Sequence, residues 1–258
     1  MGIALAVRSL SKDFGGVHAV DGVDFDAEEG SVLGLIGPNG AGKTTLFNLV
    51  SGYLSPTRGT ISLFGKEVTG LRPFALARLG VSRTFQVVRP FPRLSVLENV
   101  MVGATPRATS GFVSALFSLP RKITDEKRLA AAARSALARV SAEQTADLYP
   151  GELSYGMRKR IALARALAAS PKVLLLDEPA SGLDETELTE LGDLIRELSE
   201  EESLVVVEHH MDLMMSVCDS ITVLDFGKVI AAGTPHEVQQ DPAVTAAYLG
   251  AGNGKEQA

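Results

Sequence analysis

The sequence has little cysteine and no long hydrophobic run. Its single cysteine, Cys218, excludes an internal disulfide and fits a reducing compartment. Because Cys218 lies in the apolar stretch MMSVCDSITVL, we expect a small buried residue and not a nucleophile. No apolar run reaches the roughly 18 residues that a membrane-spanning helix needs. The first residues, MGIALAVRSLSKDF, also lack the pattern of a signal peptide, so we expect any link to a membrane to come through a partner.

Positive charge is also scarce. The 258 residues include 25 Lys and Arg against 31 Asp and Glu, a formal net charge of −6. A protein that mainly grips nucleic acid usually carries a basic surface, so this balance disfavours that role. The sequence shows no sustained heptads and no internal repeats. With 45% hydrophobic and 22% charged residues, the composition predicts a globular chain of one or two domains.

Short apolar runs alternate with helix-like segments along the chain. The runs at 31–37, 172–178 and 203–208 are typical of strands in a parallel sheet covered on both faces. Hairpins predicted at 59–68 and 220–233 indicate an antiparallel side sheet. A mainly helical stretch between two of the core strands indicates an inserted helical subdomain. Helices are predicted at 43–52, 123–140 and 185–201, and a further helix begins at 234–240.

The segment GPNGAGKTT fits the pattern G-x-x-x-x-G-K-[ST] in the required place, after a strand and at the start of a helix. Its glycines let the backbone approach phosphate oxygens, and the helix start adds roughly half a positive charge. Lys43 is placed to reach the β- and γ-phosphates, and the Thr44 hydroxyl to bind Mg²⁺. We therefore expect ATP and Mg²⁺ as ligands. The predicted cradle comprises Gly37, Pro38, Asn39, Gly40, Ala41, Gly42, Lys43, Thr44 and Thr45.

Two carboxylates follow the strand within VLLLDEP. Asp177 ends the strand, where it can share Mg²⁺ with Thr44. Glu178 comes next and can polarise a water aimed at the γ-phosphate, which is the role of a general base. Taken alone, the two carboxylates would indicate a solvated acidic turn, but the preceding phosphate loop favours the metal and the base.

The motifs follow one another as phosphate loop, LSYGM, LLLDEP, SGLD and a strand that ends in EHH. This order resembles the ATP-binding subunit of ABC transporters over nearly the whole chain. The resemblance implies a single ABC ATPase domain over 1–250, an α/β P-loop NTPase (RecA-like) fold. Its parallel-sheet core would carry an antiparallel β subdomain and an inserted α-helical subdomain at about 88–165, followed by a flexible tail at 251–258. It also implies ATP hydrolysis by a head-to-tail pair of subunits.

LSYGM stands where the family has its signature, usually LSGGQ, with Tyr155 and Met157 in place of Gly and Gln. The resemblance implies that the Ser154 hydroxyl, the Gly156 amide and the helix dipole hold the γ-phosphate of ATP bound to the partner's phosphate loop. The alternative for this segment is a plain helix start capped by Ser154.

Four further positions match family residues. Gln86 in RTFQ corresponds to the glutamine that contacts Mg²⁺ and water and senses the membrane partner; the alternative is an ordinary surface Gln. Asp184 ends SGLD, the loop that crosses the dimer interface. His209 corresponds to the switch histidine on the γ-phosphate, with a structural His as the alternative. Phe14 is placed to stack on adenine, with core packing as the alternative.

Finer matches resemble the ATP-binding subunits of branched-chain amino-acid importers. They are SGYLSPTRGTI, RTFQ, LSYG, EHHMDLMM and the ending AYLG, although His210 departs from the more usual EHDM. This resemblance implies a peripheral subunit on the cytoplasmic face of the membrane, bound to two transmembrane permease subunits and served indirectly by a solute-binding protein. Whether the second ATPase is the same chain or a related one stays open. ABC ATPases for urea, aromatic acids or lipids, or one without a transporter, remain alternatives.

The segment TPRATSGFVSALFSLPRKI is more apolar than a surface loop should be. Phe112, Leu116 and Phe117 fall at helical spacing within it. Two interpretations stay open, namely core packing of the helical subdomain and a patch that docks a membrane subunit.

Overall fold

The computed structural model describes residues 2–84, 90–107 and 120–250. Three features predicted from the sequence lie outside the described residues and remain predictions. They are the loop glutamine Gln86, the apolar residues Phe112, Leu116 and Phe117, and the tail at 251–258.

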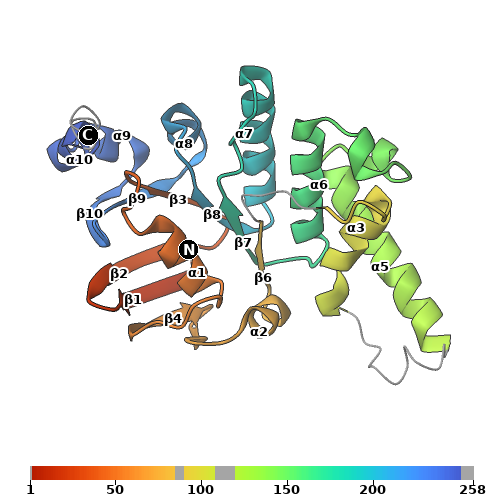
Figure 1. Cartoon of the computed structure of the whole chain (residues 1–258), viewed down its shortest axis with the longest axis horizontal. Coiled ribbons are helices and arrows are strands. Elements are labelled where there is room, and N and C mark those ends of the chain that lie inside the picture. The colour runs from red at the N-terminus through yellow and green to blue at the C-terminus, as the bar shows by residue number, and fades with distance from the viewer. Residues whose placement is uncertain (1, 85–89, 108–119, 251–258) are drawn as a thin grey trace.

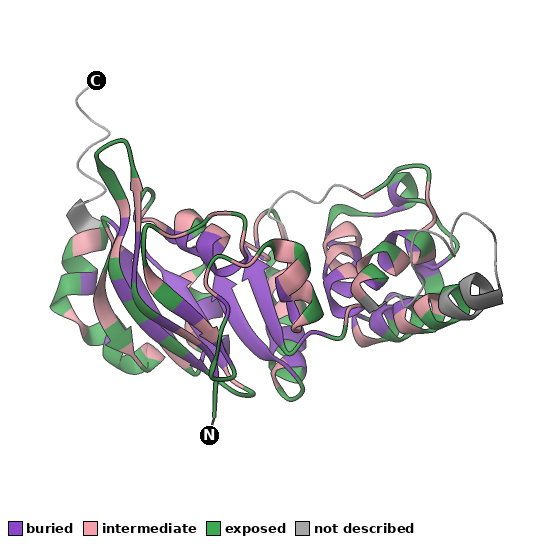
Figure 2. Cartoon of the chain, turned by 90° about the horizontal axis from the view of Figure 1, so that it is seen from below, coloured by how far each residue is buried: buried purple, intermediate pink, exposed green. Residues whose placement is uncertain are grey.

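A six-stranded sheet forms the centre of the molecule (Figure 1). Its strand order is β10-β9-β3-β8-β7-β6, and neighbouring strands from β9 to β6 run parallel while β10 is antiparallel. Every residue of the three central strands β3, β7 and β8 is buried, as their continuous apolar runs predict (Figure 2). The strands are β3 Val32–Ile36, β6 Val81–Arg83, β7 Val173–Asp177, β8 Ser203–Val207, β9 Ser220–Asp225 and β10 Lys228–Gly233.

Alternate residues of the central strands enter two separate hydrophobic cores. Leu174 and Leu176 of β7 pack in one core with the helices α7 and α8, whereas Val173 and Leu175 pack in the other with α1 and the second sheet. This alternation is the period of two that a strand imposes on its side chains. The parallel sheet covered on both faces is therefore confirmed. The helices of this part are α1 Lys43–Val50, α2 Pro73–Arg78, α7 Glu185–Ser199, α8 Met211–Val217, α9 Pro235–Gln240 and α10 Pro242–Gly250.

A second, antiparallel sheet has the order β2-β1-β4-β5 and packs on the core that contains α1. The predicted hairpin at 59–68 is present as β4 and β5. The hairpin at 220–233 also forms, but placing it in the side sheet was wrong, because β9 is buried and pairs with β3 in the main sheet. The strands of this sheet are β1 Ile3–Phe14, β2 Val17–Glu28, β4 Arg58–Leu63 and β5 Lys66–Glu67.

Three helices pack together at one end of the molecule, opposite α9 and α10 (Figure 1). They are α3 Val96–Gly103, α5 Pro120–Arg139 and α6 Tyr155–Leu167. The guanidinium of Arg139, at the end of α5, donates hydrogen bonds of 2.6 and 2.8 Å to the two carboxylate oxygens of buried Glu202, just before β8. This bidentate pair ties the helical end to the main sheet, and it raises the pKa of Arg139 above its ordinary value.

Helices α3 and α6 approach closely enough that their contact requires a glycine. A Cβ added to Gly103 would lie 1.8 Å from the carbonyl oxygen of Arg165. We expect Gly103→Ala to lower the free energy of unfolding by about 1–3 kcal/mol, because the two backbones must separate. Gly151→Ala is the control, since a Cβ there meets nothing within 4 Å. Urea denaturation measures both, and equal midpoints for the two variants would contradict the close approach.

The structure confirms Cys218 as a small buried residue. It lies among the apolar side chains of α8 and β3, and burial raises the pKa of its thiol to about 12. A thiolate nucleophile is thus disfavoured at neutral pH. Among the residues that the structure describes, no helix is both long enough and apolar enough to cross a membrane.

Candidate nucleotide-binding site

The loop between β3 and α1 has the backbone of a phosphate cradle. Gly37, Gly40 and Gly42 have φ values of 150°, 84° and 102°, which L side chains rarely adopt. A Cβ on Gly37 would lie 2.1 Å from the carbonyl oxygen of Leu224, and one on Gly42 would lie 2.4 Å from that of Ala19. A Cβ on Gly40 meets nothing within 4 Å. Close packing against the protein's own backbone therefore requires glycine at 37 and 42. At Gly40 no protein atom would contact an added Cβ.

This loop lines a cavity of about 390 Å³. Two predicted catalytic residues, Glu178 and His209, line the same cavity and reach it from the ends of β7 and β8. The structure thus brings the predicted cradle and these two residues together. The lining residues are Val17, His18, Ala19, Asn39, Gly40, Ala41, Gly42, Lys43, Thr44, Thr45, Glu178, His209 and Phe226.

Two aromatic residues compete for the role of adenine platform. Phe14 is 47% exposed, which excludes its alternative role in core packing, but it is not among the lining residues described for this cavity. Phe226, in the turn between β9 and β10, lines the cavity and is 84% exposed. Sequence reasoning missed Phe226, although an aromatic residue beside the turn glycine Gly227 was a visible signal.

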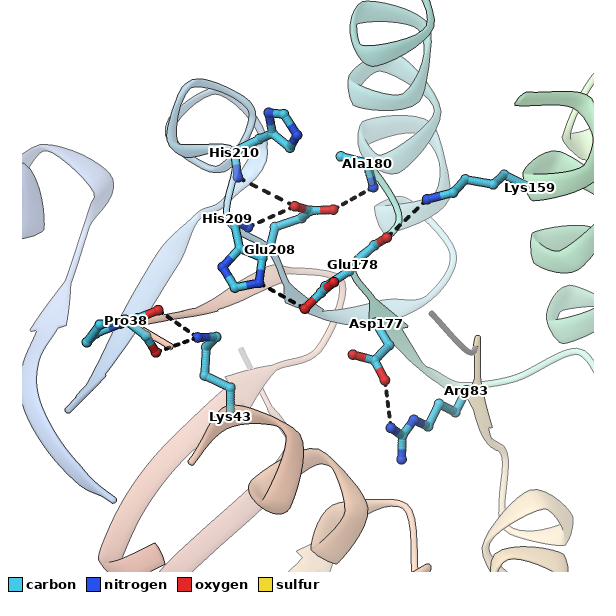
Figure 3. Close-up of polar contacts among 11 residues, drawn as sticks. Pro38, Lys43, Arg83, Lys159, Asp177, Glu178, Ala180, Glu208, His209 and His210 are labelled. Atoms are coloured by element: carbon cyan, nitrogen blue, oxygen red, sulfur yellow. Dashed lines mark hydrogen bonds and ion pairs between the residues drawn. The ribbon is translucent and has the colours of Figure 1, made fainter. Parts of the chain in front are cut away.

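Lys43 folds back over its own loop (Figure 3). Its ammonium donates hydrogen bonds to the carbonyl oxygens of Gly37 at 2.6 Å and Pro38 at 2.9 Å. Burial lowers the pKa of Lys43 from its ordinary value, and the negative charge of Glu178 opposes that shift. The side chain is therefore a buried cation at the centre of the cradle, where phosphate oxygens are expected.

Asp177 is 8% exposed and is paired with a cation that sequence reasoning missed. The guanidinium of Arg83, at the end of β6, donates to Asp177 Oδ2 at 2.6 Å. Figure 3 shows this pair. Arg83 also donates to Asn48 Oδ1 and Ser51 Oγ, both at 2.7 Å, and so connects β7 with α1. The Asp177 carboxylate is thus held in a fixed orientation by a cation that is itself anchored at the end of α1.

The donor set at this site fits magnesium brought by a nucleotide. Among the described residues no cluster of three or more His, Cys, Asp and Glu could cage a metal ion. Mg²⁺ does not need such a cage, because it usually binds one or two carboxylates together with substrate phosphates. The Thr44 hydroxyl lines the cavity together with Glu178, whereas the buried carboxylate of Asp177 lines the neighbouring cavity, which Glu178 also lines.

Glu178 and His209 form a direct pair. Nε2 of His209 lies 2.8 Å from Oε1 of Glu178 (Figure 3). The backbone of Glu178 has a φ of 47°, in the left-handed region, and its amide donates to the carbonyl oxygen of Val207 at the end of β8. The His210 ring points away from this pair, which agrees with His209 as the switch residue.

The signature segment lies on a different cavity. Ser154 caps α6 by accepting the Met157 amide at 3.2 Å, so the interpretation as a helix cap is correct locally. Ser154 and Gly156 line a cavity of about 180 Å³ with Glu187, and neither lines the phosphate-loop cavity. A Cβ on Gly156 would lie 2.0 Å from Glu187 Oε1, the end of a flexible side chain that could move aside.

The loop SGLD is packed against this signature segment. The Tyr155 ring lies against Gly182, where an added Cβ would be 3.0 Å from the ring. Asp184 caps α7 by accepting the Glu187 amide at 2.8 Å. The structure therefore groups Ser154, Gly156 and Asp184 away from the phosphate loop of the same chain. The signature cavity is also lined by Asp177 and Glu178, so Glu178 lies between the two cavities.

Comparison with known proteins agrees with this geometry. The family described as ABC transporter matches residues 20–181, and the family described as branched-chain amino acid ATP-binding cassette transporter matches residues 228–253. The high-affinity branched-chain amino acid transport ATP-binding protein BraF of Pseudomonas aeruginosa is 41% identical over 248 residues, which are 95% of this chain and 97% of that protein. LivG of Escherichia coli, a protein of the same description, is 38% identical with the same coverage.

Solved structures of ATP-binding cassettes share the whole fold. A nucleotide-free cassette from an ABC transporter is 30% identical with a TM-score of 0.84, covering 96% of this chain and 99% of that one. The ADP conformation of MJ1267, another such cassette, also has a TM-score of 0.84 at 30% identity, covering 97% of this chain and 99% of that one. The expected P-loop NTPase fold is confirmed, and the chain belongs to the ATP-binding subunits of the ABC transporter family.

Proposed function

We propose that the chain is the ATP-hydrolysing subunit of an importer for branched-chain or related amino acids. The observation that carries the proposal is the single cavity on which the phosphate loop, Glu178 and His209 meet. The similarity to BraF and LivG over nearly the whole chain supports the amino-acid substrate class. The expected location is the cytoplasmic face of the membrane, where the chain binds two permease subunits that receive solute from a binding protein.

Nucleotide binding falls to the phosphate loop. The loop amides and the Lys43 ammonium hold the β- and γ-phosphates, and Phe14 or Phe226 stacks on the base. Thr44 and Asp177 would hold Mg²⁺, with Gln86 as a third expected ligand outside the described residues. When bound, Mg²⁺ supplies positive charge against the phosphate oxygens.

Hydrolysis falls to Glu178 and His209. The Glu178 carboxylate orients a water towards the γ-phosphate and takes its proton as the bond forms. His209, within hydrogen-bond distance of Glu178, fixes the orientation of that carboxylate and is near enough to the cavity to contact the γ-phosphate. The strained backbone of Glu178 is typical of residues held for a catalytic role.

The chain carries two incomplete halves of a catalytic site. Ser154, Gly156 and Asp184 lie outside the cavity of their own phosphate loop. Ser154 and Asp184 are exposed to a second subunit, whereas Gly156 is buried against Glu187 and would have to be uncovered on closure. In a head-to-tail pair each signature helix would close over ATP held by the other subunit. The second subunit is a copy of this chain or a related ATPase.

The permease subunits are proposed to bind a groove of about 360 Å³ between α2, β6 and α6. Its lining includes the exposed apolar side chains of Tyr53, Phe91 and Val102. An apolar surface of this kind between two packed parts of a molecule is typical of a protein interface.

The direct test is transport by the assembled complex. The chain is co-purified with its membrane partners and reconstituted into vesicles with ATP inside and the solute-binding protein outside. We expect uptake of leucine, isoleucine or valine, lost when Glu178→Gln replaces the wild-type chain. Uptake of sulfate or urea but of no amino acid would contradict the substrate class. ATP turnover stimulated by DNA and not by the membrane subunits would favour an ABC ATPase without a transporter.

A further inference from the structure

The backbone conformation of Glu178 needs an explanation. A non-glycine residue in the left-handed region is disfavoured, because its Cβ crowds the following carbonyl oxygen. Such a residue persists only where its surroundings determine its conformation. Glu178 has a φ of 47° and begins the loop 178–184, which leads from β7 to α7. Two charged side chains outside the proposed chemistry contact the main chain of this loop from opposite sides (Figure 3).

Lys159 contacts the loop from the helical end of the molecule. It lies on α6, one turn after Ser154, and its ammonium donates to the carbonyl oxygens of Glu178 at 3.2 Å and Pro179 at 2.8 Å. Burial lowers the pKa of Lys159, whereas the negative charges of Glu208 and Glu178 act in the opposite direction. Lys159 is therefore a half-buried cation that donates hydrogen bonds to the carbonyl groups of two successive residues, the first of which is Glu178.

Glu208 contacts the loop from the main sheet. It follows β8 and is 1% exposed, which is unusual for a carboxylate. One of its oxygens accepts the Ala180 amide, and the other accepts the His209 amide at 2.8 Å and the His210 amide at 3.5 Å. A carboxylate that accepts several main-chain amides is well satisfied, so its burial is stable. The side chain joins the loop after β7 to the loop after β8.

We propose that Lys159 and Glu208 are positioning residues that together hold Glu178 in its left-handed conformation and fix its pairing with His209. Lys159 donates hydrogen bonds to the carbonyl oxygens of Glu178 and Pro179. Glu208 accepts hydrogen bonds from the amides of Ala180 and His209. Neither side chain lines the phosphate-loop cavity among the described residues. Lys159 lines the signature cavity, but its hydrogen bonds go to the carbonyl oxygens of Glu178 and Pro179, and it is through these that it positions Glu178. The catalytic consequence rests on the proposed function, whereas the conformational consequence does not.

The test compares two disabling variants with matched controls in the full-length chain. Glu208→Gln replaces one acceptor oxygen with an NH₂ group that faces amide donors. Lys159→Met removes the ammonium and keeps the length of the side chain. Lys159→Arg is the conservative rescue, since a guanidinium can donate to both carbonyl oxygens. Glu202→Gln controls for the loss of a buried carboxylate, because Glu202 is 3% exposed and pairs with Arg139.

Hydrogen–deuterium exchange of the chain without nucleotide reads the conformation. We expect peptides covering 178–184 to exchange about 10-fold faster in Glu208→Gln and Lys159→Met, and at the wild-type rate in Lys159→Arg and Glu202→Gln. Turnover should fall by about 10²-fold in the two disabling variants while ATP affinity stays unchanged, since misplacing a catalytic group by an ångström has an effect of that size.

If peptides covering 178–184 exchange in both disabling variants at the same rate as in Glu202→Gln, the positioning role is overturned. Where Glu178→Gln itself loses turnover, wild-type turnover in both disabling variants would overturn it as well. Failure of the proposed function is distinguishable, because it appears as full turnover in Glu178→Gln. In that case the exchange measurement still decides whether Lys159 and Glu208 hold the loop.

Discussion

Lys43→Ala is expected to weaken ATP binding by at least about 10²-fold, the scale of removing one partner from a buried, hydrogen-bonded charge pair. The Lys43 ammonium is buried at the centre of the cradle. In this structure it donates hydrogen bonds to the carbonyl oxygens of Gly37 and Pro38. We expect those hydrogen bonds to transfer to phosphate oxygens when ATP binds, and alanine cannot replace them. Isothermal titration calorimetry with Mg²⁺–ATP measures the change directly.

Lys66→Ala is the control for the loss of one lysine charge, since Lys66 is exposed in β5 on the side sheet. Its ATP affinity should equal that of the wild type. Thermal unfolding of Lys43→Ala checks that the phosphate loop still folds without its internal hydrogen bonds. Unchanged ATP affinity in a folded Lys43→Ala protein would overturn the assignment of residues 37–45 as the phosphate cradle.

Glu178→Gln is expected to bind ATP normally and to lose turnover by about 10²–10⁴-fold, the usual contribution of a general base. Glutamine has nearly the same shape and can keep a hydrogen bond to His209, but it cannot take a proton from water. Because the ATP is not consumed, the closed pair of subunits should accumulate. Phosphate release measures the turnover, and sedimentation velocity with and without ATP measures the trapped dimer.

Glu202→Gln again serves as the control, because it removes a buried carboxylate that is not among the described lining residues of either cavity. It should turn over ATP at the wild-type rate and form no trapped dimer. Full turnover in Glu178→Gln would remove Glu178 as the base. It would not affect the assignment of the phosphate loop as the ATP-binding segment, since that assignment depends on other residues.

The sequence predicted the parts of the fold that local pattern determines. Continuous apolar runs identify β3, β7 and β8, because a strand buried on both faces needs apolar side chains at every position. The long strands β1 and β2 were not predicted, since one face of each is exposed and polar residues interrupt the pattern. The hairpin at 220–233 was predicted correctly but assigned to the wrong sheet, because pairing partners are set by the tertiary fold.

In the candidate site, too, continuous motifs could be predicted from the sequence, whereas contacts between distant residues could not. The phosphate loop and Asp177–Glu178 are continuous motifs, so the sequence alone was enough to propose them. Arg83 and Glu208 escaped notice because their roles depend on partners far away in the chain, Asp177 and Ala180. The pairing of Glu178 with His209 was within reach, since both residues follow core strands and parallel neighbours end at the same edge. The structure shows that register, with Asp177 opposite Val207.

The central claim is that one molecule holds two halves of different catalytic sites, and the direct test is the rate of ATP hydrolysis per molecule during dilution. The range must span the transition from dimer to monomer, as followed by sedimentation in the same buffer. Our account predicts that the rate per molecule falls towards zero as the monomer fraction rises. A rate per molecule that stays constant into the fully monomeric range would contradict it.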